Sequence, residues 1–156
     1  WDLKWIGLRY FNVAGAGWPD LADDAVMNLI PMVLDRVERG ESAKIFGTDY
    51  DTPDGTCIRD YIHVLDLAEA HIAALDVLAE GRQPDHHTYN VGTGLGTSVR
   101  EIVDGLRRVM GWEFPVEELD RRAGDPPKLI GDPLSIGVDL GWKANNGVEE
   151  ILTSAW

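Results

Sequence analysis

The sequence predicts an α/β fold, in which strands and helices alternate along the chain. Runs rich in β-branched and aromatic residues, typical of strands, are followed by segments whose apolar residues recur at the helical spacing of three and four. The clearest helix is 64–79, which Gly81 ends, and Ser98 with Glu101 forms a capping box that begins the next helix. With 156 residues, 44% of them hydrophobic, the chain can bury a sizeable core.

The first expected element is a buried strand over 5–13, which is rich in aromatic and β-branched residues and runs into a loop of small residues. An acidic loop follows, and either Asp23 or Asp24 can cap a helix from Ala25 to Arg39 that ends before a glycine. The remaining expected elements are strands at 43–46, 57–62, 88–91, 116–119 and 128–130, and helices at 64–79, 98–110, 134–140 and 148–155.

Charge and composition narrow the class of protein. The chain carries 14 Lys and Arg against 27 Asp and Glu, a formal charge of −13, which opposes binding to nucleic acids and to anionic membranes. No apolar stretch approaches the roughly 18 residues of a membrane helix. The single cysteine, Cys57, excludes an internal disulfide and fits a reducing compartment, so we expect a cytoplasmic protein with neither a nucleic-acid nor a membrane partner. The chain opens without Met on a strand, and we expect it to be a fragment.

One glycine-rich segment and one acidic segment resemble known ligand-binding motifs but lack residues that those motifs need. Residues 92–98 resemble a dinucleotide-binding turn, but Thr97 occupies the position of its third glycine, which predicts an ordinary strand-to-helix turn instead of the NAD site. Residues 49–55 resemble a calcium loop, but Pro53 stands at a ligand position and Asp54 displaces the required glycine. We therefore interpret 49–55 as a solvated acidic loop and expect no metal site.

Two other segments each contain several charged or polar side chains close together in the sequence. Residues 59–64 place a cation, a carboxylate, a phenol and an imidazole at a strand end, as either a catalytic cluster or a hydrogen-bonded structural corner would. Residues 121–125 place paired arginines beside an acidic residue in a loop. Those guanidinium groups either grip a phosphate bidentately or form a surface salt-bridge cluster. The residues alone leave both pairs of alternatives open.

Read together, seven segments resemble the C-terminal half of the UDP-glucose 4-epimerases, members of the extended short-chain dehydrogenase/reductase family. The resemblance is collinear and covers nearly the whole chain. Its segments are Leu-Arg-Tyr-Phe-Asn-Val-Ala-Gly-Ala at 8–16, Asn-Leu-Ile-Pro at 28–31, Ile-Phe-Gly-Thr-Asp-Tyr-Asp-Thr-Pro-Asp-Gly-Thr at 45–56, Arg-Asp-Tyr-Ile-His-Val-Leu-Asp-Leu-Ala at 59–68, Tyr-Asn-Val-Gly-Thr-Gly at 89–94, Arg-Arg-Ala-Gly-Asp at 121–125 and Leu-Gly-Trp at 140–142.

The resemblance implies a homodimeric enzyme that interconverts UDP-glucose and UDP-galactose through a 4-keto intermediate with bound NAD. It implies the C-terminal part of a Rossmann-like NAD-binding fold plus the smaller α/β UDP-sugar-binding domain. In such a chain 1–16 and about 64–95 would pack on the Rossmann core, while about 17–63 and 96–156 would form the substrate domain. The family's glycine-rich fingerprint and catalytic Tyr and Lys precede the matched region, so no catalytic residue is expected here and the 156 residues alone are expected to be inactive.

The resemblance also implies roles for individual residues, all of them around a bound nucleotide. Phe11 matches the residue that packs by the nicotinamide. The substrate-contacting matches are Asn12 for the sugar nucleotide, Asn28 and Leu29 for the diphosphate, Lys44, Ile45 and Phe46 for the strand passing the uracil, Arg59 and Arg122 for the diphosphate, Asp125 for the ribose, and Leu129 for the position that governs whether an N-acetylated sugar fits.

Two alternatives stay open at this point. The first is another NAD-dependent sugar-nucleotide epimerase, dehydratase or decarboxylase of the same family. The second is a non-catalytic nucleotide-binding module.

Overall fold

The computed structural model describes residues 3–23, 25–82 and 87–156, and it confirms the α/β architecture. The strands are β1 (Gly7–Tyr10), β2 (Asn12–Ala14), β3 (Ala43–Phe46), β4 (Ile58–Arg59), β5 (Tyr61–His63), β6 (Thr88–Val91), β7 (Thr97–Ser98), β8 (Val116–Leu119) and β9 (Lys128–Leu129). The helices are the 3-10 turn η1 (Pro19–Leu21), α1 (Leu29–Glu38), α2 (Val64–Ala79), α3 (Val99–Met110), α4 (Leu134–Leu140) and α5 (Val148–Ala155).

Most predicted elements lie where the sequence places them, and the capping box of Ser98 and Glu101 is present at the start of α3. The two longest predicted strands are wrong in one respect, because each is divided. The strand over 5–13 breaks at Phe11 and the strand over 57–62 breaks at Asp60. Each break lies where the chain leaves one sheet for another, since β1 pairs with β6 while β2 pairs with β5, and β4 pairs with β7 and β9.

The predicted start of the first long helix is also wrong, since α1 begins at Leu29 instead of Ala25. A helix from Ala25 would require Pro31 to donate an N–H that proline lacks, whereas a start at Leu29 leaves Pro31 in the first turn, where no such bond is needed. The backbone N–H of Ala25 donates instead to the carboxylate of Asp23 at 3.0 Å, in a local turn.

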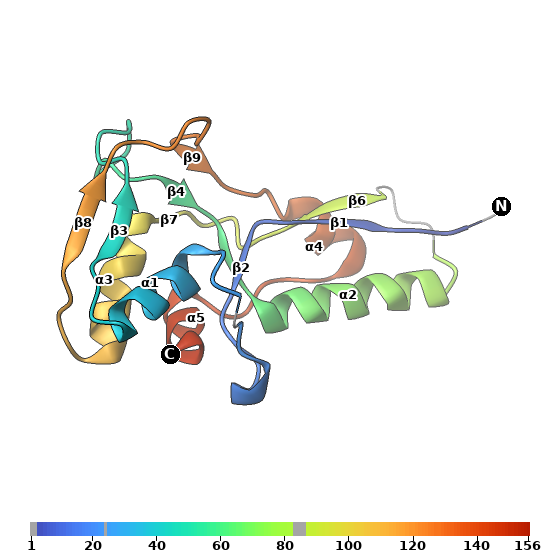
Figure 1. Cartoon of the computed structure of the whole chain (residues 1–156). Helices are drawn as coiled ribbons and strands as arrows, with labels where there is room; N and C mark the ends of the chain where they lie inside the picture. Colours follow the sequence, from blue (N-terminus) through green and yellow to red (C-terminus); the bar gives the residue numbers. More distant parts are fainter. Residues whose placement is uncertain (1–2, 24, 83–86) are drawn as a thin grey trace.

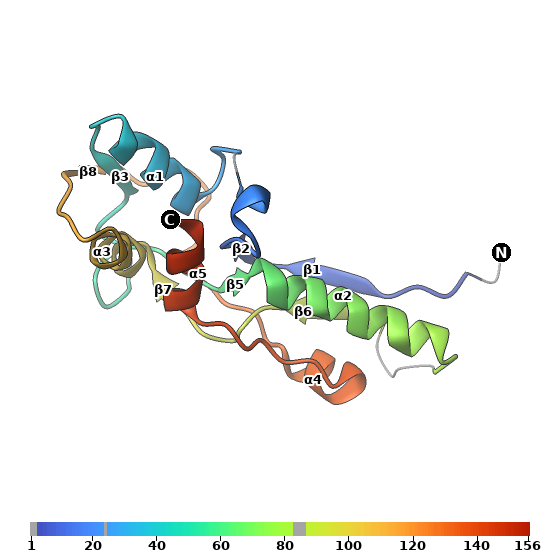
Figure 2. The ribbon, with the colours of Figure 1, turned by 90° about the horizontal axis from the view of Figure 1, so that it is seen from below.

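The strands form four small sheets, and the structure has two lobes. Figures 1 and 2 show β1, β6, α2 and α4 in one lobe and β3, β8, α1, α3 and α5 in the other, with the β2–β5 pair between them. The pairs β1–β6, β2–β5 and β3–β8 are parallel, and β4 lies between antiparallel β7 and parallel β9. None of the described helices is long and apolar enough to cross a membrane.

Each lobe has its own buried cluster. One joins α1, β3, α3 and α5, and its fully buried members include Ile30, Ile45, Leu106 and Leu152. The other joins α2, β6 and α4, and its fully buried members include Val77, Tyr89, Val91 and Ile136. Helix α4 therefore packs with α2 and β6, although α3 before it and α5 after it in the sequence both belong to the other cluster.

The carboxylate of Asp60 holds the crossing point between the lobes. Its side chain is fully buried, and it accepts hydrogen bonds from the backbone N–H and hydroxyl of Thr93 (2.9 and 2.7 Å), from the Gly94 N–H (3.0 Å) and from the Gly131 N–H (3.2 Å). A Cβ at Gly92 would lie 2.5 Å from the same carboxylate, so that glycine is required by packing. The turn over 92–98 is thus the strand-to-helix turn that the sequence predicts, and the N–H groups of Thr93 and Gly94 donate to Asp60.

Replacing Asp60 tests this role. Asp60→Asn puts an amide donor among four donors, so we expect it to lower the free energy of unfolding by about 2–4 kcal/mol. Urea denaturation followed by circular dichroism measures the change, with Asp76→Asn on the exposed surface of α2 as a matched control. Equal effects of the two substitutions would contradict the role assigned to Asp60.

Candidate functional site

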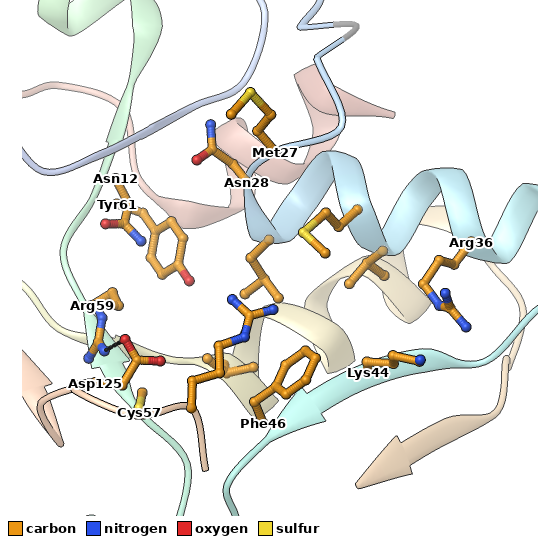
Figure 3. Close-up of a pocket in the computed structure, with 15 residues that line it drawn as sticks. Asn12, Met27, Asn28, Arg36, Lys44, Phe46, Cys57, Arg59, Tyr61 and Asp125 are labelled. Carbon is orange, nitrogen blue, oxygen red and sulfur yellow. Dashed lines mark ion pairs between the residues drawn. The ribbon is translucent and has the colours of Figure 1, made fainter. Parts of the chain in front are cut away.

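A cavity of about 220 Å³ opens between α1, β3, the β4–β5 segment and the loop before β9 (Figure 3). Eight of the site residues expected from the sequence line it. They are Asn12, Asn28, Leu29, Lys44, Phe46, Arg59, Arg122 and Asp125. Residues from five separate parts of the chain therefore converge on one hollow.

Three expected site residues do not line the cavity. Ile45 is 1% exposed and lies in the core, because alternation along β3 turns it away from Lys44 and Phe46. Phe11 is half-buried, and its ring fills the space that a side chain on Gly92 or Gly131 would need. Leu129 is exposed on β9, in register with Arg59 of β4.

Arg59 is held at the cavity by its own strand and by the loop before β9. Its guanidinium donates to the carbonyls of Ile58 and Pro126, both at 2.9 Å, and forms an ion pair with Asp125 at 3.5 Å (Figure 3). Its side chain is only 12% exposed. These contacts fix the direction of the guanidinium and leave its charge only partly balanced.

Arg122 reaches the same cavity in another way. Its guanidinium carbon lies 3.8 Å from the centroid of the Phe46 ring, a cation–π contact that uses the flat face of the guanidinium and leaves its N–H edge available. Within the described residues no carboxylate pairs with Arg122, so its charge faces the cavity without a partner.

Arg121 points elsewhere, although it is the next residue in the chain. Its Nε lies 2.6 Å from an oxygen of Asp49, and its guanidinium stacks on the ring of Tyr50 at 4.3 Å. The hydrogen bond from Arg121 lowers the pKa of the Asp49 carboxyl. Each of the two alternatives for the paired arginines therefore holds for one of them. Arg121 forms a surface salt bridge, while Arg122 lines the cavity, where it could bind a phosphate.

The side chains of the segment 59–64 also have two different roles, some at the cavity and some in the structure around it. Arg59 and Tyr61 face the cavity, as residues two apart in an extended segment do. His63 instead caps α2, since its Nδ1 accepts from the Leu65 N–H at 3.1 Å and its Nε2 lies 3.0 Å from the hydroxyl of Ser154. With Asp60 buried among backbone donors, the acid and the imidazole form a structural corner.

In the predicted solvated loop over 49–55, Asp49 and Asp51 are exposed as expected, whereas Asp54 is partly buried. Asp54 accepts hydrogen bonds from the N–H and hydroxyl of Thr56, both at 2.8 Å, and from the hydroxyl of Ser98. Burial acts to raise the pKa of Asp54, but these hydrogen bonds outweigh it and hold the pKa below its usual value. Among the described residues no group of three or more His, Cys, Asp or Glu could hold a metal ion.

Comparison with known proteins places the chain in a family. Residues 1–92 match the NAD dependent epimerase/dehydratase family. The chain belongs to this family. A UDP-glucose 4-epimerase of Rhizobium leguminosarum bv. trifolii is 41% identical over 159 residues, which cover 99% of this chain and 48% of that protein. The chain thus spans about half the length of the curated relatives it matches.

Solved structures of family members share the fold. The UDP-glucose 4-epimerase of Brucella ovis in complex with NAD is 42% identical with a TM-score of 0.90, over 98% of this chain and 48% of that one. The enzyme of Stenotrophomonas maltophila with bound NAD and formylated UDP-arabinopyranose is 35% identical with a TM-score of 0.91, over 100% of this chain and 47% of that one. These similarities confirm the expected Rossmann-like α/β class.

The cavity contains seven residues that the resemblance did not assign to the site. They are Met27, Met32, Val33, Arg36, Cys57, Tyr61 and Val99. Periodicity could have found several of them. Helical spacing from Leu29 gives Met32, Val33 and Arg36 on one face of α1, and alternation from Arg59 gives Cys57 and Tyr61.

The hydrogen bonds of Asp54 predict an acid-dependent contribution to stability. Because its folded pKa lies below the ordinary value of 3.8, the contribution is complete above pH 3.8 and is lost as the pH falls through the folded pKa. We expect Asp54→Asn to lower the free energy of unfolding by ~1–3 kcal/mol at pH 6, with the deficit shrinking below pH 3.8. Urea denaturation from pH 6 to pH 3 measures it, with exposed Asp51→Asn as control. A deficit that stays constant with pH would contradict the assignment.

Proposed function

We propose that this chain is the nucleotide-binding half of a UDP-glucose 4-epimerase, which interconverts UDP-glucose and UDP-galactose through a 4-keto intermediate with bound NAD. The observation that carries the proposal is the convergence of Arg59 and Arg122 on one cavity that also contains Asn12, Asn28 and Asp125. Family membership and the names of the relatives support the same activity.

The two arginines suit the diphosphate of a sugar nucleotide. An Arg–phosphate contact at about 4 Å and an effective dielectric near 20 is worth ~4 kcal/mol, whereas a carboxylate about 15 Å away across water opposes it by ~0.3 kcal/mol. The net charge of −13 therefore does not prevent the cavity from binding an anion. Long-range repulsion still disfavours a nucleic acid.

The remaining cavity residues suit the rest of UDP. We propose that Asn12, Asn28 and Leu29 contact the sugar nucleotide beside the arginines, and that Asp125 accepts from the ribose. Backbone groups of 44–46 lie along β3 at the cavity wall and would pair with the uracil edge. Holding the substrate by its UDP part leaves the sugar free to turn between oxidation and reduction.

NAD would supply the hydride chemistry when bound. Phe11 fits the role of a nicotinamide neighbour, because its ring rests against the backbone of Gly131 and keeps part of its surface accessible. Leu129, exposed on β9, is the residue we propose to limit the size of the sugar at C2.

We further propose that the described lobes complete a larger enzyme. Residues 1–16 and about 64–95 would pack on a Rossmann core, and about 17–63 and 96–156 would form the substrate domain. Ile72 and Leu75, which are 58% and 64% exposed on α2, are available for such packing. We propose a homodimeric, cytoplasmic enzyme, for which the free thiol of Cys57 suits a reducing compartment, and we propose that the 156 residues alone are inactive.

Arginine substitutions test the binding site in the full-length protein. Arg59→Ala and Arg122→Ala each remove a charge-assisted bond worth about 1.5–3 kcal/mol, so we expect UDP affinity to fall roughly 10- to 100-fold. Isothermal titration calorimetry measures it. Arg121→Ala is the matched control, because Arg121 contacts Asp49 and Tyr50 outside the cavity. Unchanged UDP affinity in both cavity variants would remove these arginines from the site.

Substrate competition tests the reaction. The full-length enzyme is expected to convert UDP-galactose faster than UDP-galacturonate or UDP-N-acetylgalactosamine, because the relatives that resemble this chain over nearly its whole length are UDP-glucose 4-epimerases. Product formation is followed by chromatography with each substrate at equal concentration. Faster conversion of either competitor would overturn the substrate assignment and favour another member of the same family.

A further inference from the structure

Tyr61 is a polar residue of the cavity to which the proposed function assigns no role. It lies on β5 and is 4% exposed, and its ring belongs to the buried cluster that includes Ile30 and Val33. It nevertheless lines the cavity, and Figure 3 shows its hydroxyl directed into the hollow while the ring stays in the wall. The apolar part of the side chain is thus packed, and the polar tip is at the binding surface.

The position of the hydroxyl is set by the neighbouring strand. Asn12 of β2 is the register partner of Tyr61 in the parallel β2–β5 pair, and both side chains line the cavity. Side chains in register on adjacent strands lie on the same face and within reach of each other. Asn12 therefore stands beside the phenol where it meets the cavity.

The phenol stays protonated over the working pH range. Burial raises the pKa of Tyr61 to about 12, while a hydrogen bond with the Asn12 side chain works in the opposite direction, as expected when the amide donates to the phenol oxygen. The hydroxyl hydrogen then remains free to donate. No acceptor for it is found among the described residues, so a bound ligand is the available partner.

We propose that the hydroxyl of Tyr61 donates a hydrogen bond to the diphosphate of the bound sugar nucleotide, as a third donor beside Arg59 and Arg122. The inference rests on the proposed function. A phosphate oxygen is favoured as the acceptor because Tyr61 is two residues from Arg59 on the same side of the segment, and both reach one cavity. A neutral donor strengthens anion binding without adding a charge that would itself need a partner.

The test compares two ligands in the full-length protein. UDP carries the diphosphate and uridine does not, so Tyr61→Phe is expected to weaken UDP binding about 10-fold or more while changing uridine binding less than twofold. UDP is titrated by calorimetry, and uridine is measured by its displacement of UDP at millimolar concentration. Both constants come from one preparation, so a change in the folded fraction cancels in their ratio.

Tyr50→Phe is the matched control. It removes a hydroxyl from a tyrosine that is 5% exposed but lies outside the cavity, and it is expected to leave both affinities unchanged. Unchanged UDP affinity in Tyr61→Phe, or equal weakening of UDP and uridine, would overturn the inference and leave the proposed function standing. A wild-type protein that fails to bind UDP would overturn both.

Discussion

The buried carboxylate of Asp60 is the constraint on which the cavity depends. It lies between Arg59 and Tyr61, which both face the cavity, and it binds backbone N–H groups of the turn after β6 and of the segment after β9. One residue thereby joins the two lobes at the point where the chain passes from β4 to β5. Moving that point would displace the guanidinium of Arg59 and the hydroxyl of Tyr61 together.

The site itself depends on arginines whose charges the neighbouring carboxylates do not fully balance. The protein has many more acidic than basic residues, and most of the described arginines pair with a carboxylate. Arg122 is different because it rests on an aromatic face, and Arg59 is different because it donates to two carbonyl groups and its carboxylate partner, Asp125, lies 3.5 Å away. A cavity in an acidic protein can therefore bind an anion through two guanidinium groups whose charges its own carboxylates do not fully balance.

Local sequence predicts the elements well and their junctions poorly. The bounds of α2 and β6 follow from periodicity and flanking residues, and Pro31 contains the information needed to place the start of α1. The breaks at Phe11 and Asp60 could not be predicted locally, because they arise from pairing with strands distant in the sequence.

The candidate site shows the same division. Eight of the residues that the resemblance assigned to the site line one cavity. The alternation of side chains along the strands, which the resemblance does not take into account, turns Ile45 into the core and places Tyr61 in the cavity wall. The divergence of Arg121 and Arg122 depends on the rings of Tyr50 and Phe46, which no motif links to them. Contacts between distant segments, and not the residue type, therefore decide which of the two neighbouring arginines lines the cavity.

A crystal structure of the full-length protein with UDP bound tests most directly whether Arg59 and Arg122 bind the diphosphate. We expect the diphosphate to lie between the guanidinium groups of Arg59 and Arg122, with the uracil along the strand of Phe46. A diphosphate bound elsewhere, with both guanidinium groups more than hydrogen-bonding distance from every phosphate oxygen, would contradict it.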